Sequence, residues 1–475
     1  MTTGRPNILL IMSDQHRADA IGAAGHPVVQ TPHLDRLAGD GVRFDRTYCQ
    51  GPLCMPARAS FLTERYVRDH GVSDNTFQLD PGPLPTFVGA LRDAGYHTAA
   101  IGKLHLYTHG GAGDTRDHLA RLHEFGFQEA HELVGKMASR RVGSPYHDYL
   151  KEKGLYERYV EWAAQPVRLW EPLPWTLGVA SYQDTWVGRE TVRWLEQYDR
   201  AEPFFLQVGF PGPHSPWDAP PEYVERYHDV QIPLGSTRPP ERPPTGPLRA
   251  FLDMWYPIRS VPDGMPDASI IACRRAYYAA ITLIDEQIGA IVAALDARRM
   301  LDNTWVVYTT DHGEMMGDHR MYEKVVFYEP SVRVPLIIRP PGGTTGHVEP
   351  GIVEHIDVPA TLRSVAGAGA VPGSAGRVLP AGRPLAISEN HGFAAFITDR
   401  YKLIVWEDTK EPVALFDLES DPNEDANLVD DPEAGPIRRQ IMERHVEPFL
   451  STAPVRLGLH MVERQSHAAD GQRTR

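Results

Sequence analysis

Four short apolar segments, each followed at once by polar residues, constrain the fold of this chain most. They span residues 7–12, 97–101, 203–208 and 304–310, and segments with helical spacing separate them. Continuous apolar runs of this length are typical of strands that are buried on both faces of a parallel sheet. Open α/β sheets place their ligands beyond the carboxyl ends of such strands. We therefore expect an α/β fold whose site is formed by the residues that follow these segments.

The most specific motif lies between Cys49 and Tyr66, which read CQGPLCMPARASFLTERY. Pro56 suits the first turn of a helix, so Cys54 is expected where a loop enters a helix. The free N–H groups and partial positive charge at that end lower a thiol's pKa and attract anions. Arg58, one turn later, adds donors that suit a tetrahedral oxyanion. For an isolated cysteine, the alternative is a buried, inert thiol.

The full pattern resembles the signature of the formylglycine-dependent sulfatases, which belong to the alkaline phosphatase superfamily. CMPAR followed by ASFLTER matches the Cys-x-Pro-x-Arg core whose Cys is oxidised to Cα-formylglycine. Tyrosine-phosphatase-type thiol sites space Cys and Arg more widely than Cys54 and Arg58 are spaced here. The resemblance implies a large, mostly parallel sheet flanked by helices, as in alkaline phosphatase. It also implies a formylglycine-generating enzyme as the maturation partner.

Further motifs extend the resemblance along the chain. Residues 102–105, GKLH, resemble the sulfatase GKWHLG motif, and residues 213–216, PHSP, resemble its PH-x-P segment. Residues 311–324 resemble the DHGE-x-x-GDH…K block, and residues 414–428, ALFDLESDPNEDANL, resemble a C-terminal sulfatase segment. Residues 109–184 show no clear period, and by family analogy they supply the wall that selects the organic part of the substrate.

The resemblance implies roles for individual residues. A sulfate monoester would be attacked by hydrated formylglycine at position 54, and His105 would take the second diol proton so that sulfate is expelled. Asn75 matches a residue near the substrate's charged oxygens, although as an isolated residue it is a turn former. The implied catalytic residues are Cys54, Arg58, Lys103, His105, His214 and Lys324.

The resemblance also implies one divalent metal at the ends of the first and last of the four strands. Asp14 alone would be a loop or capping residue, and many sulfatases carry Asp where this chain has Gln15. Oxygen-rich ligation suits Ca²⁺, while one imidazole also admits Mn²⁺ or Zn²⁺. The implied metal ligands are Asp14, Gln15, formylglycine derived from Cys54, Asp311 and His312.

Other functions fit parts of the pattern. A phosphonate monoester or phosphodiester hydrolase of the same superfamily shares the formylglycine and the ligand set. That group typically has uncharged residues at the positions of Lys103 and His105, so these side chains favour a sulfatase. Choline sulfate stays open as a substrate, although the sequence shows no clear cage of aromatic and acidic residues. The remaining alternative is a protein without catalytic activity that keeps Cys54 as a thiol and uses the metal pocket to bind an oxyanion.

Composition sets limits on partners and location. The chain has 475 residues, a formal net charge of −14 and a pI near 5.8, which argue against nucleic-acid or anionic-membrane partners. Its three cysteines give no disulfide framework. The N-terminal apolar run is too short for a signal peptide, and no later segment is expected to span a bilayer. We therefore expect a cytoplasmic protein and leave a homo-oligomer open.

A Gly/Pro-rich stretch at residues 367–384 reads as a linker. We predict an N-terminal catalytic α/β domain over residues 1–375. A smaller C-terminal α+β subdomain with a short antiparallel sheet is predicted over residues 376–464, followed by a disordered tail over 465–475.

Overall fold

The structure is a computed structural model that describes residues 4–79, 85–108, 113–256 and 259–454. The predicted tail over residues 465–475 lies outside the described residues.

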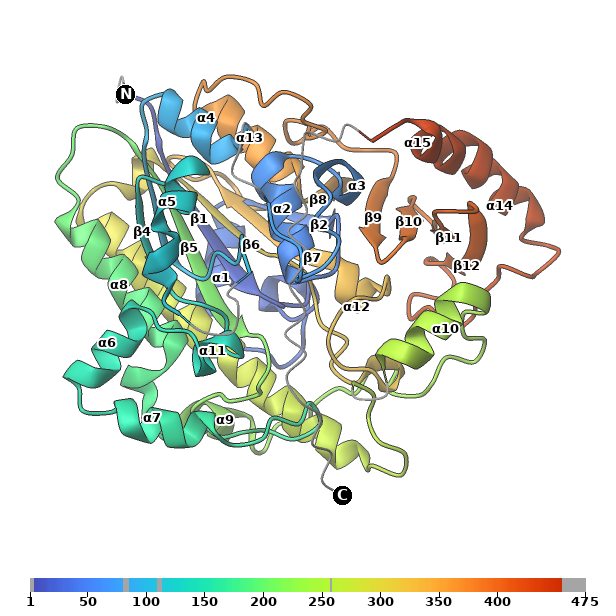
Figure 1. The fold of residues 1–475 in the computed structure, drawn as a ribbon, viewed down its shortest axis with the longest axis horizontal. Coiled ribbons are helices and arrows are strands. Elements are labelled where there is room, and N and C mark those ends of the chain that lie inside the picture. The colour runs from blue at the N-terminus through green and yellow to red at the C-terminus, as the bar shows by residue number, and fades with distance from the viewer. Residues whose placement is uncertain (1–3, 80–84, 109–112, 257–258, 455–475) are drawn as a thin grey trace.

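An eight-stranded sheet organises most of the chain (Figure 1). Strand β7 runs antiparallel to both of its neighbours, whereas the other pairs are parallel, which confirms the mostly parallel sheet. In spatial order the strands are β4 (Glu129–Glu132), β3 (His97–Gly102), β5 (Phe204–Pro213), β1 (Asn7–Asp14), β6 (Thr304–Thr310), β7 (Arg333–Arg339), β2 (Val42–Tyr48) and β8 (His347–Glu354).

Strand β1 lies in the middle of this sheet and shows why its sequence is apolar throughout. Leu9 and Ile11 pack into one core layer, and Ile8 and Leu10 pack into the other. Because successive side chains of a strand point to opposite faces, a strand covered on both faces needs no polar alternation. The pairing places Asp14 beside Pro213, so the ends of neighbouring strands meet at one edge.

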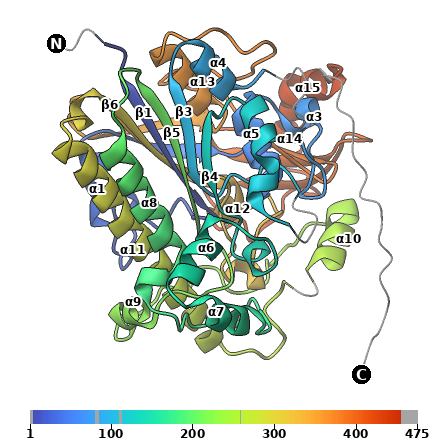
Figure 2. The same cartoon turned by 60° about the vertical axis from the view of Figure 1, so that its left-hand side comes forward.

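Helices cover both faces of the sheet, as Figure 2 shows. One layer contains α1 (Pro32–Gly39), α8 (Gln183–Gln197) and α11 (Asp267–Ala297), and the other contains α2 (Cys54–Thr63), α4 (Phe87–Asp93) and α13 (Asp357–Val365). The remaining helices are α3 (Val67–His70), α5 (Leu119–Glu124), α6 (Pro145–Glu152), α7 (Tyr156–Ala163), α9 (Pro221–Val224), α10 (Gly246–Trp255) and α12 (Glu329–Val332).

Helix α11 is the longest helix among the described residues. From Cys273 onward its apolar residues recur at helical spacing, which predicts a helix over residues 273–299, but the helix begins earlier, at Asp267, and ends at Ala297. It is long and apolar enough to cross a membrane by length and composition alone. The protein itself buries 61% of its most apolar window. Its apolarity is therefore accounted for by packing in the core layer that contains α1 and α8.

The C-terminal region forms a separate four-stranded antiparallel sheet, as predicted. Its strands are β9 (Ala386–Asn390), β10 (Phe393–Ile397), β11 (Tyr401–Trp406) and β12 (Glu411–Asp417), and the helices beside it are α14 (Gly435–Ile441) and α15 (Glu447–Ser451). One core cluster combines Ile352 of the large sheet with Phe393 and Phe416 of the small one. The domain boundary near residue 375 stays a prediction.

Candidate active site

Four side chains that could hold a metal ion meet at the carboxyl edge of the large sheet. Asp14 ends β1, Asp311 and His312 follow β6, and Cys54 begins α2. Their potential ligand atoms all lie within 4.8 Å of one another, and all four residues are buried. The tertiary structure thus brings together residues that are up to 298 positions apart in the sequence.

Cys54 occupies the first residue of helix α2, as the sequence predicts. Burial alone would raise the pKa of its thiol, but Lys103, Lys324 and His312 lower it well below its usual range. Cys54 Sγ lies 3.2 Å from Nε2 of His312. A thiolate is the form that neighbouring cations stabilise and that reacts.

The other ring nitrogen fixes the orientation of His312. Its Nδ1 lies 2.9 Å from the carbonyl oxygen of Gly313, to which it donates. Nε2 therefore faces the cluster, and a hydrogen bond of this kind is the usual support of a metal-binding imidazole. Burial lowers the pKa of His312, yet Asp311 and Cys54 raise it to about 9. A bound cation would have to displace that proton.

Two cations neutralise the buried carboxylates. Arg58 donates from Nε to Asp311 at 2.8 Å and from Nη2 to Asp14 at 3.2 Å, and Lys103 also pairs with Asp14. Burial and Cys54 oppose ionisation of Asp14, but Lys103, His214 and Arg58 hold its pKa below the usual range. Oδ1 of Asp14 is buried and has no hydrogen-bond partner among the described residues. Such an orphaned carboxylate oxygen fits a divalent cation.

Gln15 lies beside this cluster with its side chain held at both ends. Its Oε1 accepts a hydrogen bond from Lys324 Nζ at 2.5 Å, and its Nε2 donates to Glu314. Its backbone N–H donates to Asp311 at 3.1 Å. Because Glu314 binds the amide nitrogen, the carbonyl oxygen is the end that Gln15 turns toward Lys324 and can offer to a metal.

Close approach of two strands positions Lys103. Gly102 ends β3 next to Gly209 of β5, where a Cβ on Gly102 would lie 2.1 Å from the Gly209 carbonyl oxygen. Only glycine permits this approach. His105 follows with a φ of 53° and forms a hydrogen bond with Cys54. Burial lowers the pKa of His105 below its usual value, although the contact with Cys54 raises it.

His214 and Lys324 form a hydrogen-bonded pair at the same edge. Lys324 Nζ donates to His214 Nε2 at 2.8 Å, while His214 Nδ1 donates to the carbonyl oxygen of Ser215 at 2.6 Å. Lys324 also lies 2.8 Å from Glu323. Burial raises and Lys324 lowers the pKa of Glu323, which falls to about 2. This pair can deliver a proton to an oxygen in the site.

Asn75 takes a supporting position in this structure. Its Oδ1 accepts a hydrogen bond from the backbone N–H of Met55 at 2.9 Å. That N–H is one of the free donors at the start of α2, so Asn75 fixes the helix end that carries Cys54.

Sequence reasoning missed three acidic residues that support the site. Glu314 and Glu323 lie within the DHGE…K block, where only the cations and ligands were singled out. Glu132 ends β4, a strand that the sequence analysis did not recognise, and burial raises its pKa to about 7. The same rule of polar residues at strand ends would have found Glu132 if β4 had been predicted.

The comparison with known proteins decides the family. The family model described as Sulfatase matches residues 6–368, which include all the predicted site residues. This chain belongs to the sulfatase family.

Characterised relatives of this sulfatase include enzymes with different substrates. The arylsulfatase of Clostridium perfringens (strain 13 / Type A) is 32% identical over 454 residues, covering 90% of this chain and 91% of the relative. The choline-sulfatase of Rhizobium meliloti (strain 1021) is 30% identical, covering 92% and 85%. The phosphonate monoester hydrolase structure from Agrobacterium radiobacter superposes with a TM-score of 0.76 at 26% identity, covering 94% and 96%. The sulfatase is thus a sulfuric ester hydrolase.

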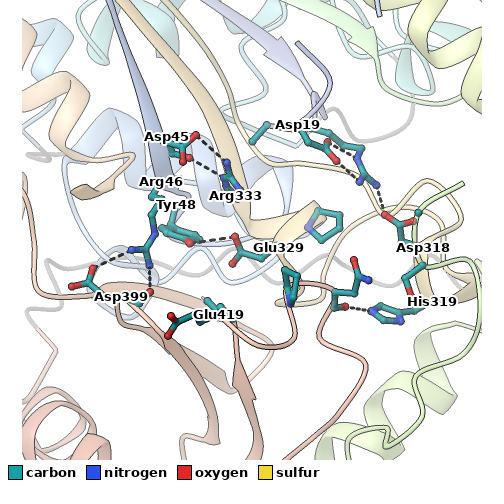
Figure 3. A pocket seen from close by; sticks show the side chains of 18 residues that line it. Asp19, Asp45, Arg46, Tyr48, Asp318, His319, Glu329, Arg333, Asp399 and Glu419 are labelled. Carbon is teal, nitrogen blue, oxygen red and sulfur yellow. Dashed lines mark hydrogen bonds and ion pairs between the residues drawn. The ribbon is translucent and has the colours of Figure 1, made fainter. Parts of the chain in front are cut away.

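Of two cavities in the described part of the protein, one adjoins the active site at the carboxyl edge of the large sheet and the other does not. One of about 380 Å³ is lined by His214 and Glu323 and therefore adjoins the active site. Another of about 500 Å³ lies between the large sheet and the C-terminal sheet (Figure 3). Several of its charged side chains are paired with one another, as in Arg333 with Asp45 and Arg46 with Asp399. None of the four clustered residues lines it, so the larger cavity is not the reaction site.

Proposed function

We propose that the enzyme hydrolyses a sulfate monoester to an alcohol or phenol and inorganic sulfate, with Cα-formylglycine made from Cys54 as the nucleophile. The observation that carries this proposal is the buried cluster of Asp14, Cys54, Asp311 and His312. Cys54 stands at a helix start among cations, where an anionic ester would be attracted.

We propose one divalent cation in this site, with Ca²⁺ as the first choice and Mn²⁺ or Zn²⁺ as alternatives. The residues that would hold it are Asp14, Gln15, residue 54, Asp311 and His312. The orphaned Oδ1 of Asp14 supports this assignment. When bound, a divalent cation supplies Lewis-acid stabilisation of negative oxygen.

The chain's own cations would stabilise the sulfuryl group. Lys103 and Lys324 lower the pKa of the Cys54 thiol more than any other neighbours do. Their positive charges therefore lie close to residue 54, where the ester would be attacked. Together with Arg58 they would hold the ester oxygens as charge redistributes during transfer. His214, which accepts a hydrogen bond from Lys324, would stand near the leaving oxygen and share a proton with it.

His105 would act in the second half of the reaction. It contacts the side chain of residue 54 from the loop after β3. There it would accept the proton of the second hydroxyl of hydrated formylglycine, so that the aldehyde reforms and sulfate leaves. This step explains why an oxidised cysteine rather than serine is needed.

A phosphonate monoester or phosphodiester hydrolase is the second candidate. The structural likeness to the Agrobacterium radiobacter phosphonate monoester hydrolase favours it. The presence of both Lys103 and His105 in the site favours sulfate esters.

The first experiment is the mass of the proteolytic peptide that carries residue 54, after co-production with a formylglycine-generating enzyme. We expect an aldehyde, followed by kcat/KM for aryl sulfates well above that for phosphonate monoesters. The double variant Lys103→Ala/His105→Ala should lower sulfate turnover by about a hundredfold or more. Full-rate hydrolysis by the unmodified thiol would overturn the formylglycine proposal, and unchanged sulfate turnover in the double variant would overturn the preference for sulfate.

We further propose a cytoplasmic enzyme that depends on a formylglycine-generating partner. All three cysteines are free and buried, which is consistent with a reducing compartment.

A further inference from the structure

The cavity of about 380 Å³ that adjoins His214 has an apolar wall. Met137, Val167, Leu169 and Trp170 form this wall, and Met137 leaves 37% of its surface exposed. Apolar side chains kept accessible beside catalytic groups are typical of a ligand pocket. The position next to His214 is where the leaving group of an ester would project.

The main chain behind this wall is fixed. Trp217 Nε1 donates to the carbonyl oxygen of Leu169 at 2.5 Å, and the Leu173 N–H donates to the Trp217 carbonyl oxygen at 3.0 Å. Trp217 itself is only 2% exposed. The apolar side chains are therefore presented from a rigid support, which lowers the entropy cost of binding a flat group.

The two arginines that line the cavity differ in whether they have a carboxylate partner. Arg259 stacks on Trp255, with its guanidinium carbon 4.2 Å from the ring centre, and donates to the Trp255 carbonyl oxygen at 3.0 Å. No carboxylate in the described part of the chain forms an ion pair with Arg259. By contrast, Arg168 at the rim is paired with Glu171 at 3.0 Å.

Glu323 is the lining carboxylate, and its charge is already compensated. It lies 2.8 Å from Lys324 and accepts a hydrogen bond from Ser215 Oγ at 2.8 Å. Binding of a quaternary ammonium group needs carboxylates without a cationic partner, or a cage of several aromatic rings. The residues that line this cavity provide neither of these. The charge left to act on a ligand is that of Arg259.

We propose that this cavity selects sulfate esters of a phenol that carries a carboxylate, with the ring against Trp170 and the carboxylate on Arg259. The proposal rests on the proposed function and narrows its substrate class. A planar guanidinium held by stacking is suited to bidentate binding of a carboxylate. The same wall and charge disfavour choline sulfate.

The test compares carboxylate esters with neutral esters of nearly the same shape, and with an ester of a cationic alcohol. We would measure kcat/KM for the 3- and 4-carboxyphenyl sulfates, the corresponding carbamoylphenyl sulfates and choline sulfate. The better carboxyphenyl ester should exceed its neutral partner by about tenfold or more, and Arg259→Gln should reduce that ratio about tenfold. The control is Arg249→Gln, which changes an exposed side chain of helix α10 that is paired with Asp253, and it should keep the wild-type ratio.

A binding measurement separates this inference from the proposed function. Calorimetry with 3- and 4-hydroxybenzoate and the matching hydroxybenzamides needs no turnover, and Arg259→Gln should weaken only the acids. An unchanged ratio in Arg259→Gln, or a higher kcat/KM for choline sulfate than for the aryl esters, overturns the inference and leaves the sulfatase proposal intact. If formylglycine is present and no sulfate ester is hydrolysed, the proposed function is overturned, and the binding arm still decides the role of Arg259.

Discussion

Several residues at the site hold backbone conformations that their side chains disfavour. Gln15 and His105 have φ angles of 71° and 53°, and Val325, next to Lys324, has a φ of 84°. Left-handed backbone is costly for a residue with a Cβ and most of all for a β-branched one. The amide of Asn390 donates to the Val325 carbonyl oxygen at 2.8 Å and helps to hold this conformation. Such concentration of strain supports a functional assignment of this edge.

Lys103 reaches the cluster past a glycine. A Cβ on Gly135 would lie 2.7 Å from Lys103 Nζ and 3.0 Å from its Cε. Because the end of a lysine side chain is flexible, Gly135→Ala should move the ammonium group rather than unfold the protein. We expect kcat/KM to fall about tenfold to a hundredfold with little change in Tm, measured by sulfatase kinetics and thermal unfolding.

The control for this variant is Gly39→Ala, where an added Cβ meets no atom within 4 Å. It should keep wild-type kinetics. If Gly135→Ala loses activity and its Tm also falls by several degrees, the added methyl group has caused a packing defect. That outcome would contradict the explanation through Lys103.

Asp311 is a proposed metal ligand, and it also pairs with Arg58 at 2.8 Å. Asp311→Asn keeps the shape of the side chain but removes its charge. We expect loss of the bound divalent cation and a fall in kcat by about a hundredfold or more, measured as metal per chain by elemental analysis and as turnover. Prolonged chelation of the unchanged enzyme should reproduce the loss, and added Ca²⁺ should reverse it. Full metal content in Asp311→Asn would refute the ligand assignment.

At the scale of elements, helix α11 organises the start of helix α1. Asp285 of α11 accepts the backbone N–H groups of His33 at 3.1 Å and Leu34 at 2.8 Å. These are donors at the N-terminus of α1 that the helix itself cannot satisfy. Burial raises the pKa of Asp285 to about 7, although those hydrogen bonds lower it.

This pKa gives a prediction for stability against pH. The folded state holds the Asp285 proton more tightly than the unfolded state, whose pKa is near 4. The resulting stabilisation is therefore complete below about pH 4 and is lost as the pH rises through about 7. We expect the free energy of unfolding of the wild type to decline over this window relative to Asp285→Asn, as measured by denaturant titrations. Parallel curves for the two proteins would show that Asp285 ionises normally.

Local sequence predicted the elements that carry the site better than those at the sheet's borders. Strands β1, β3, β5 and β6 are short apolar runs, and each was predicted because both of its faces are buried. Strand β4, with the sequence EAHE, has mostly half-buried side chains and no apolar run. Its strand conformation comes from pairing with β3, which no local pattern reveals.

At the scale of the whole molecule, a buried ionic cluster joins the two sheets. Lys402 of β11 is fully buried and lies 2.8 Å from Glu329 of α12 and 2.7 Å from Glu424. Removing the lysine would leave two carboxylates buried without their partner. Lys402→Met should therefore destabilise the protein by about 3–5 kcal/mol, measured by denaturant unfolding.

The control is Lys410→Met, which removes an exposed lysine bonded to Ser451. It should shift stability by no more than about 0.5 kcal/mol. If Lys402→Met unfolds in two steps, this cluster is what couples the unfolding of the two sheets. An unfolding curve equal to that of the wild type would contradict the account of Lys402.

The sequence by itself determined the family and the strand ends that carry polar residues, and it predicted the four residues that meet in the buried cluster. Those conclusions rest on local patterns, because burial on both faces demands apolar strands and the Cys54 motif is contiguous. Only the tertiary structure decided which acids support the cluster, how Asn75 is used and which cavity adjoins His214. These depend on side chains brought together from distant segments by strand pairing, and no local pattern specifies which distant groups will meet.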